Sequence, residues 1–246
     1  MGRCVRMMRL DKLVSNIGNI SRQEARRQIA AGAVCVDGAV ITQPEHKVDE
    51  TACAVTLSGT PLTYRKYRYF MMDKPAGVLT ATTDRDQKTV VDLLPEELRR
   101  LQLVPAGRLD KDTTGLLLLT NDGDFVHRVI SPRHHVPKVY YAETDGTPTA
   151  ADAERFAAGM TLADGTRCLP ARLELLDTPN ACRVTIREGK YHQVKRMLAA
   201  CGTPVVKLRR LSIGGLLLDN LLTSGGYREL TAAEIASVFV DAVPEN

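Results

Sequence analysis

Residues 106–123 of this 246-residue chain read AGRLDKDTTGLLLLTNDG, and the rest of the chain is organised around this stretch. Two carboxylates, Asp110 and Asp112, stand among basic side chains in its first half. The apolar run 116–119 predicts a buried strand, and the Asn-Asp-Gly sequence after it predicts a turn. A loop of charged side chains that leads directly into a buried strand is unfavourable unless it serves chemistry. The stretch is therefore the first candidate for a functional site.

Composition and charge are those of a folded protein with an uneven charge distribution. Hydrophobic residues make up 44% of the chain, which is long enough for one large domain or for a small one and a larger one. The formal net charge is only +4, yet residues 1–27 hold seven basic residues against two acidic ones. This basic segment suggests a polyanionic partner, although the solvated surface of an ordinary helix would have the same composition.

The cysteines, the histidines and the apolar runs exclude several other classes of protein. The six cysteines form no C-x-x-C pair, so we expect reduced thiols rather than a disulfide framework or a zinc site. Residues 1–8 lack the apolar region of a signal peptide, and no run approaches the ~18 apolar residues that span a bilayer. No metal ligands are assigned, because His127, His134, His135 and His192 lack metal-site spacing. We expect a soluble, cytoplasmic protein without membrane contact.

The first part of the chain predicts a small module of two helices and a hairpin. Four apolar residues recur at the spacing of one helix face, which would end near Gly18: Leu10, Leu13, Val14 and Ile17. Ser21 and Glu24 form a capping-box pattern that opens a second helix, and Gly32 lies where that helix would end. Residues 34–41 then predict a tight hairpin around an Asp-Gly turn.

This module resembles the S4 RNA-binding domain, with Arg9-Leu-Asp-Lys12 at its start and Val36-Asp-Gly38 at its turn. We assign residues 1–58 to it, with residues 1–7 as an N-terminal extension. The resemblance implies that basic side chains contact RNA phosphates, which gives affinity and orientation but little base recognition. The side chains predicted to bind RNA there are Arg9, Lys12, Arg22, Arg26 and Arg27.

A second, larger domain is predicted for residues 68–246, after a linker at 59–67 that contains Gly59 and Pro61. Strands are expected near 69–72, 116–119, 138–142, 167–176, 181–187, 204–210 and 213–218. Helices are expected at 125–130, 150–159, 191–201 and from Thr231 onward. Many strands with few helices, and no strict alternation between them, indicate an α+β fold.

Two other enzyme classes share the pattern of paired carboxylates. The D-x-D-x-T sequence also begins the site of haloacid-dehalogenase-type phosphatases, which use Mg²⁺, but their apolar strand precedes the pair instead of following it. A glycosidase-like pair is conceivable. However, Asp110 and Asp112 lie in a predicted turn, where their spacing fixes no geometry. An aspartate directly before Thr-Thr-Gly more readily accepts hydrogen bonds from its own turn, so Asp112 is expected to be structural.

Four blocks occur in the order typical of pseudouridine synthases: residues 73–77 (DKPAG), 106–123, 138–140 (KVY) and 188–197 (EGKYHQVKRM). With the S4-like module ahead of them, the chain resembles the RsuA family over nearly its whole length. The resemblance implies a mixed, largely antiparallel sheet flanked by helices. It also implies that Asp110 is the catalytic aspartate, that Tyr140 packs on the target base and that Lys195 pairs with Asp110. Arg108 is expected near the RNA backbone or the space left by the flipped base.

The implied reaction converts uridine to pseudouridine in RNA. The base leaves its stack, the N1–C1′ bond breaks, and the ring rejoins the ribose through C5. This exchange is redox-neutral and needs neither a metal nor a nucleotide cofactor, in keeping with the lack of a P-loop or GxGxxG motif. Whether Asp110 attacks covalently or removes a ribose proton is left open.

The expected target is 16S rRNA, alone or in a partly assembled small ribosomal subunit. Residues 131–138 and 191–197 look more like the small-subunit enzyme of the family than its large-subunit relatives, which implies uridine 516. A site in 23S rRNA is the alternative within the family. A non-catalytic ribosome-assembly factor is another, but it would require a broken site, and Asp110, Tyr140 and Lys195 are all present. With no coiled coil or large apolar patch evident, we expect a monomer.

Overall fold

The computed structural model describes residues 7–18, 20–49, 53–62 and 65–241. The chain divides into two compact units, one of residues 1–67 with 96–101 and one of residues 68–95 with 102–246. Across the described ranges, no helix combines the length and the apolar character needed to cross a membrane.

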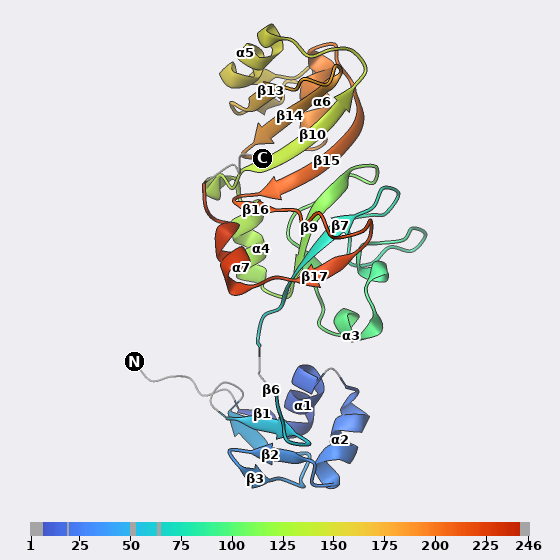
Figure 1. The fold of residues 1–246 in the computed structure, drawn as a ribbon, viewed down its shortest axis with the longest axis vertical. Coiled ribbons are helices and arrows are strands. Elements are labelled where there is room, and N and C mark those ends of the chain that lie inside the picture. The colour runs from blue at the N-terminus through green and yellow to red at the C-terminus, as the bar shows by residue number, and fades with distance from the viewer. Residues whose placement is uncertain (1–6, 19, 50–52, 63–64, 242–246) are drawn as a thin grey trace. The chain divides into compact units, whose positions relative to one another are not determined.

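The smaller unit consists of helices and short strands, labelled in Figure 1: β1 (Met7–Arg9), α1 (Leu10–Gly18), α2 (Arg22–Ala30), β2 (Val34–Val36), β3 (Ala39–Val40), β4 (Lys47–Asp49), β5 (Val55–Leu57), β6 (Thr60–Leu62) and α3 (Glu96–Arg99). Four strands form an antiparallel sheet in the order β3-β2-β5-β6, and β1 pairs separately with β4. Ser21 caps α2 as predicted, since its hydroxyl accepts the Glu24 amide at 3.0 Å. The Glu24 carboxylate instead binds Arg27 and Gln28, so only half of the predicted capping box forms.

The core of the smaller unit follows the predicted spacing. Residues from both helices and from the strands form one buried cluster: Leu10, Leu13, Val14, Ala25, Ile29, Val34, Val36, Val48 and Val55. Ile17, the last of the predicted helix-face residues, is partly buried against this cluster. The hairpin also forms as predicted, with Asp37 and Gly38 at positive φ in the turn.

Secondary structure extends past two of the boundaries predicted for this unit. Met7, the last residue of the predicted extension, begins β1, which pairs with β4. The rest of that extension, residues 1–6, lies outside the described residues. Residues 60–62 of the predicted linker form β6, whose Leu62 pairs with Val55. The reason is a tight turn at Ser58 and Gly59, both at positive φ, which returns the chain onto β5.

The larger unit is built around one long sheet (Figure 1). Its elements are β7 (Tyr69–Lys74), η1 (Val91–Leu93), β8 (Val104–Pro105), β9 (Thr114–Thr120), α4 (Gly123–Ile130), η2 (Pro132–His134), β10 (Lys138–Thr144), α5 (Ala150–Ala158), β11 (Met160–Thr161), β12 (Arg167–Cys168), β13 (Arg172–Leu175), β14 (Ala181–Ile186), α6 (Gln193–Ala200), β15 (Val205–Ile213), β16 (Leu216–Leu217), β17 (Tyr227–Glu229) and α7 (Ala232–Ser237). The sheet order is β13-β14-β10-β15-β9-β7-β17, with β16 added to β15 and β8 to β9. The β9–β15 pair is parallel and its neighbours along this path are antiparallel, which confirms the predicted mixed, largely antiparallel α+β fold.

Gly115 allows β9 and β15 to approach each other. It pairs with Arg210 and has φ +100°, which a side chain rarely adopts. A Cβ atom at this position would lie 2.3 Å from the Arg210 carbonyl oxygen, so the backbones would have to separate. The glycine of the Thr-Thr-Gly sequence is therefore required where the loop that carries Asp110 enters the sheet.

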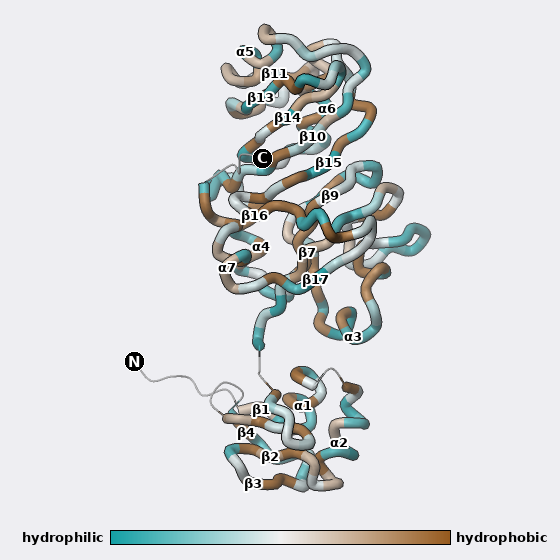
Figure 2. Tube along the Cα trace, in the orientation of Figure 1, coloured by the Kyte–Doolittle hydropathy of each residue, from teal (hydrophilic) through white to brown (hydrophobic). Residues whose placement is uncertain are grey.

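The leucine run 116–119 is buried on both faces of β9, as the continuous apolar pattern predicts. Leu116 and Leu118 pack in a cluster with Phe125 of α4 and with Val238, next to the end of α7. Figure 2 shows that β7 and β16 also consist largely of hydrophobic residues. β9 thus gives the loop in front of it a rigid support.

Some predicted elements differ in extent from those observed. The strand predicted at 167–176 is broken into β12 and β13, with Pro170 between them. The strands predicted at 204–210 and 213–218 are one long strand, β15, followed by a Gly214-Gly215 turn and the short β16. The helix predicted to start at Tyr191 begins only at Gln193.

Candidate active site

A cleft of about 960 Å³ opens in the larger unit. Its lining includes residues of the segment after β7, the loop before β9, α4, β10, β14, β15 and the segment that begins α6. The predicted site residues Arg108, Asp110 and Tyr140 all line it. Cavities of several hundred Å³ hold drug-sized ligands, so a nucleotide fits into this space.

Hydrogen bonds from Thr80 and Thr113 fix the backbone of the loop that carries Asp110. The Thr80 hydroxyl donates to the Leu109 carbonyl at 2.8 Å and accepts the Leu109 amide at 3.2 Å. The Thr113 amide donates to the Asp110 carbonyl at 3.1 Å and closes a turn. The Asp110 side chain keeps 28% of its surface exposed, so a substrate in the cleft can reach its carboxylate.

Lys74, the last residue of β7, binds the same loop from the interior. It is fully buried, and its Nζ lies within 2.9–3.2 Å of the carbonyl oxygens of Pro75, Asp110, Lys111 and Thr113. Burial lowers the pKa of Lys74 to about 8, although the nearby carboxylates partly oppose this shift. Lys74 therefore ties the end of β7 to the backbone carbonyls of Asp110 and of the residues that follow it.

Lys195 of α6 bridges the two carboxylates of the loop. Its Nζ lies 3.2 Å from Asp110 Oδ2, as the family resemblance implies, and 2.5 Å from Asp112 Oδ1. Burial alone would lower the pKa of Lys195, but the two carboxylates outweigh it and raise the pKa above its usual range. The Asp112 side chain is 75% exposed, and its hydrogen bond from Lys195 lowers its pKa. Asp112 therefore shares Lys195 with Asp110, in addition to the structural role predicted for it in the turn.

His192 completes the surroundings of Asp110. It precedes α6 in the left-handed region, with φ 49°, and its Nε2 lies 3.4 Å from Asp110 Oδ1. Its ring stacks on the ring of Tyr191, with centroids 3.8 Å apart, and Tyr191 is 76% exposed. The helix predicted at 191–201 includes His192, whereas the observed helix begins after it, so the sequence did not predict this contact.

Tyr140 lies on β10 and is 7% exposed. Its hydroxyl accepts a long hydrogen bond from Arg210 Nη1, at 3.5 Å. An irregularity in the β10–β15 register places Tyr140 directly opposite Arg210. The tyrosine ring is therefore fixed on the wall of the cleft whose lining also includes Asp110.

The basic residues predicted to bind RNA occupy two kinds of position. Arg9, Arg22 and Arg26 all bind the buried carboxylate of Asp11, at 3.0, 3.2 and 2.9 Å. Their side chains stay 41–53% exposed. Of the others, Arg27 pairs with Glu24, Lys12 is exposed on α1, and Arg108 is exposed at the cleft.

Sequence reasoning missed Lys74, His192, Lys138 and Arg210. Lys74 and Lys138 belong to the quoted blocks, where the motif letters alone suggested no role. Lys138 lines the cleft and its Nζ donates to the carbonyls of Val129 and Val136. Burial, with a contribution from Arg210, lowers the pKa of Lys138 to about 8.

The described part of the chain contains no cluster of side chains that could bind a metal ion. No three His, Cys, Asp or Glu side chains of these residues gather in a way that could hold a metal ion. The arrangement around Asp110 is instead a partly exposed carboxylate between two basic side chains, Lys195 and His192. Such a group can act as a nucleophile or as a base on a bound substrate.

The chain is similar to known proteins over nearly its whole length. The chain is 47% identical to "Uncharacterized RNA pseudouridine synthase YtzG" of Bacillus subtilis, over 93% of the chain and 97% of that protein. It is 46% identical to "Ribosomal small subunit pseudouridine synthase A" of Escherichia coli K12, over 94% of the chain and 100% of that protein. A solved structure described as "Crystal structure of pseudouridylate synthase" is 37% identical, with a TM-score of 0.67 over 94% of this chain and 99% of that one.

Family models account for both parts of the sequence. The S4 domain model matches residues 8–52. The model of RNA pseudouridylate synthase matches residues 68–200, a range that contains Asp110, Tyr140 and Lys195. The chain therefore belongs to the RNA pseudouridylate synthase family and is an RNA-modifying isomerase with an S4 domain.

Proposed function

We propose that this enzyme isomerises one uridine of the small-subunit ribosomal RNA, uridine 516 of 16S rRNA. The high identity to a protein named for the small ribosomal subunit supports this target, as does the coverage of nearly the whole of both chains. The segments 131–138 and 191–197, which suggested the small-subunit target from sequence, contribute residues to the lining of the cleft.

The observation that most directly supports this function is the contact between Lys195 Nζ and Asp110 Oδ2, which lie 3.2 Å apart. Asp110 lines the same cleft as Tyr140. A uridine must leave its stack to reach this carboxylate, which costs a few kcal/mol, and packing on the Tyr140 ring offsets part of that cost. Lys195 stabilises the ionised carboxylate that either route requires, covalent attack on the nucleotide or removal of a ribose proton.

The bond exchange conserves atoms and electrons. The N1–C1′ bond breaks, the ring turns, and a C5–C1′ bond forms. C5 then loses its proton and N1 gains one. No electron acceptor or donor is consumed, so the side chains around Asp110 need only position groups, stabilise charge and move protons.

The smaller unit supplies RNA affinity in this proposal. Arg9, Arg22 and Arg26 share one carboxylate among three positive charges, so the cluster keeps a positive excess for phosphates. Lys12 and Arg27 extend this basic surface, and Arg108 contacts the backbone next to the flipped nucleotide. We further propose that the enzyme acts as a monomer in the cytoplasm, on free 16S rRNA or on a partly assembled small subunit.

Pseudouridine mapping of total rRNA tests this function. We expect position 516 to be modified in cells that carry the gene, unmodified after its deletion, and restored by the wild-type gene but not by Asp110→Asn. Loss of a 23S rRNA position instead would move the target to the large subunit. Unchanged modification of all rRNA would contradict the catalytic role and favour a non-catalytic assembly factor.

A further inference from the structure

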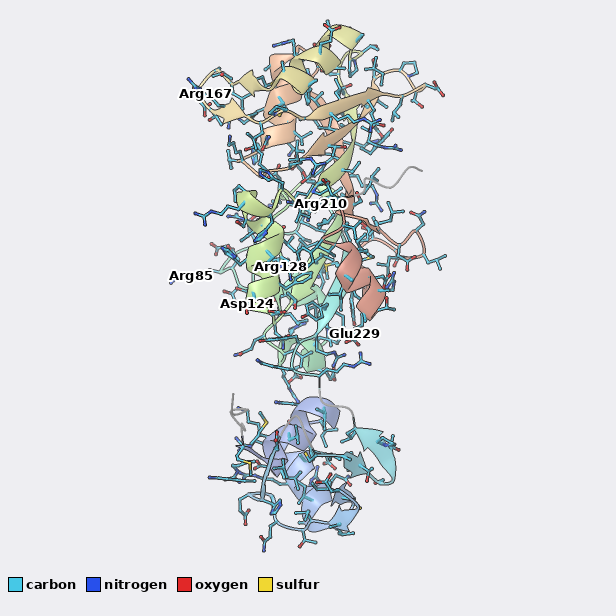
Figure 3. The ribbon with its side chains drawn as sticks, turned by 90° about the vertical axis from the view of Figure 1, so that its left-hand side faces the viewer. Arg85, Asp124, Arg128, Arg167, Arg210 and Glu229 are labelled. Atoms are coloured by element: carbon cyan, nitrogen blue, oxygen red, sulfur yellow. The ribbon has the colours of Figure 1, made fainter. Side chains whose placement is uncertain are left out.

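Arg210 of β15 is a buried arginine, and one of its guanidinium nitrogens, Nη2, is not hydrogen-bonded to any described residue. Only 2% of its surface is exposed, and it lines the same cleft as Asp110. Its Nε donates to the Leu116 carbonyl at 2.7 Å and its Nη1 reaches the Tyr140 hydroxyl at 3.5 Å. In the part of the chain that the structure describes, Nη2 has no hydrogen-bond partner. Figure 3 shows Arg210 among the strands of the larger unit, whereas Arg85 and Arg167 lie at its edge.

This arrangement is unfavourable in the empty enzyme. A buried donor without an acceptor loses its hydration, and a buried guanidinium without a carboxylate loses more. The preceding residue shows the usual solution, since Arg209 Nη2 binds Asp73 Oδ2 at 2.9 Å. No carboxylate of the described residues forms such a pair with Arg210. Arg210 lines the cleft, and an unpaired buried donor on such a residue is best explained by an acceptor on the substrate.

The surroundings of Arg210 define the kind of acceptor. Lys138, also on the cleft wall, is close enough for Arg210 to contribute to lowering its pKa, so this part of the cleft is positive. The phosphates of a flipped nucleotide stay with the RNA strand, where the exposed Arg108 can meet them. The base is the part that enters deepest, and Tyr140, the residue assigned to the base, contacts Arg210 directly. The acceptor that fits this place is a carbonyl oxygen of the uracil ring.

We propose that Arg210 Nη2 donates a hydrogen bond to a carbonyl oxygen of the flipped uracil and holds the ring while it is detached from the ribose. This role rests on the proposed function. When the N1–C1′ bond breaks, its electron pair stays on the ring and spreads over N1, C5 and the two carbonyl oxygens. The same pair then forms the C5–C1′ bond. Arg210 stabilises this charge by donating a hydrogen bond and transfers no proton.

Sulphur substitution in the RNA tests the contact. Two target RNAs carry 2-thiouridine or 4-thiouridine at the modified position, because sulphur accepts hydrogen bonds more weakly than oxygen. For each enzyme, the single-turnover rate on oxygen RNA is divided by the rate on thio RNA. At one of the two positions we expect this ratio to be roughly 10-fold to 100-fold larger for wild type than for Arg210→Gln. The intrinsic effect of sulphur on the ring cancels in this comparison.

Arg209→Gln is the matched control, since it removes the neighbouring arginine, which is paired with Asp73. It should keep the wild-type ratio at both positions. Arg210→Lys keeps a positive charge near Leu116 but has no second branch, so it should behave like Arg210→Gln and serves if that variant does not fold. Equal ratios for wild type and these Arg210 variants at both positions would overturn the proposal. If wild type makes no pseudouridine even in the oxygen RNA, the proposed function itself fails, which is a different outcome.

Discussion

Each unit of this enzyme contains an aspartate held by basic side chains, and the two sites differ in which partner is buried. In the smaller unit the carboxylate of Asp11 is fully buried, and Arg9, Arg22 and Arg26 around it are about half exposed. In the larger unit Asp110 is 28% exposed in a cleft, and the fully buried charge beneath it is that of Lys74.

This difference separates a carboxylate that is closed to ligands from one that a substrate can reach. Asp11 has no face left for a ligand, so it can only organise the arginines that it binds. Asp110 keeps an open side, while Lys74 fixes the backbone that carries it and leaves its carboxylate available. Burial of the cation rather than the acid is what places Asp110 within reach of a substrate.

Removing the Asp110 charge should have the largest effect. We expect Asp110→Asn to lower the single-turnover rate by at least about 1,000-fold, since neither covalent attack nor proton removal works without the carboxylate. RNA affinity should stay within about threefold, because phosphate contacts dominate binding. Asp112→Asn is the matched control, and its exposed carboxylate should cost less than about 10-fold in rate. Wild-type turnover by Asp110→Asn would show that another group performs the chemistry.

Removing the buried lysine should have the next largest effect. Lys74→Met leaves the carbonyls of the Asp110 loop without their shared donor, so the carboxylate is less well positioned. Because small misplacements of a catalytic group are costly, we expect kcat to fall by about 10-fold to 100-fold with RNA affinity unchanged. Single-turnover kinetics and filter binding measure the two quantities. Lys207→Met, which removes an exposed lysine on β15, should leave both unchanged, and the idea fails if Lys74→Met does likewise.

Asp11→Asn should destabilise the smaller unit and leave the chemical step intact. The loss of a buried charge partner should lower the free energy of unfolding of that unit by roughly 2–3 kcal/mol, as denaturant titration can measure. Burial alone would raise the pKa of Asp11, but hydrogen bonds from Arg9, Arg26 and Arg22 hold it well below its usual range.

The pH dependence of Asp11 follows from the direction of that shift. A carboxylate with a lowered pKa in the folded state stabilises the fold fully above its unfolded pKa of about 3.9, and this contribution declines as the pH falls below it. Wild type should therefore lose stability in the smaller unit on acidification below about pH 4. Asp11→Asn should lack this part of the loss. Parallel acid titrations of the two proteins would contradict this account.

Single arginines at the surface should have the smallest effect. Arg26→Gln should weaken RNA binding only a few-fold and reduce the slope of log affinity against log salt by about 1, because one phosphate contact is lost. Arg172→Gln removes an exposed arginine of the larger unit, paired with Glu174, and should change neither quantity. An unaltered slope for Arg26→Gln would exclude this arginine from the RNA interface.

Adjacent arginines on β15 illustrate what could not be predicted from sequence. Arg209 and Arg210 are identical side chains in consecutive positions, and in a strand they point to opposite faces. Arg209 binds Asp73, which lies 136 residues away in the chain. Arg210 donates hydrogen bonds to the Leu116 carbonyl and to the Tyr140 hydroxyl. No local pattern distinguishes them, because their partners come from distant strands. His192 escaped prediction for a different reason, since its contact depends on where α6 begins.

The sequence by itself determined the elements whose signals are local. These include the capped helix after Ser21, the hairpin at Asp37-Gly38 and the buried strand 116–119, because spacing and turn chemistry act over a few residues. The order of the motif blocks also predicted that Lys195 pairs with Asp110, a contact that the structure contains. Only the tertiary structure decided which charges are buried, which are shared and which stay open. Those outcomes depend on desolvation and on contacts between segments far apart in the chain, as the position of Lys74 beneath the Asp110 loop shows.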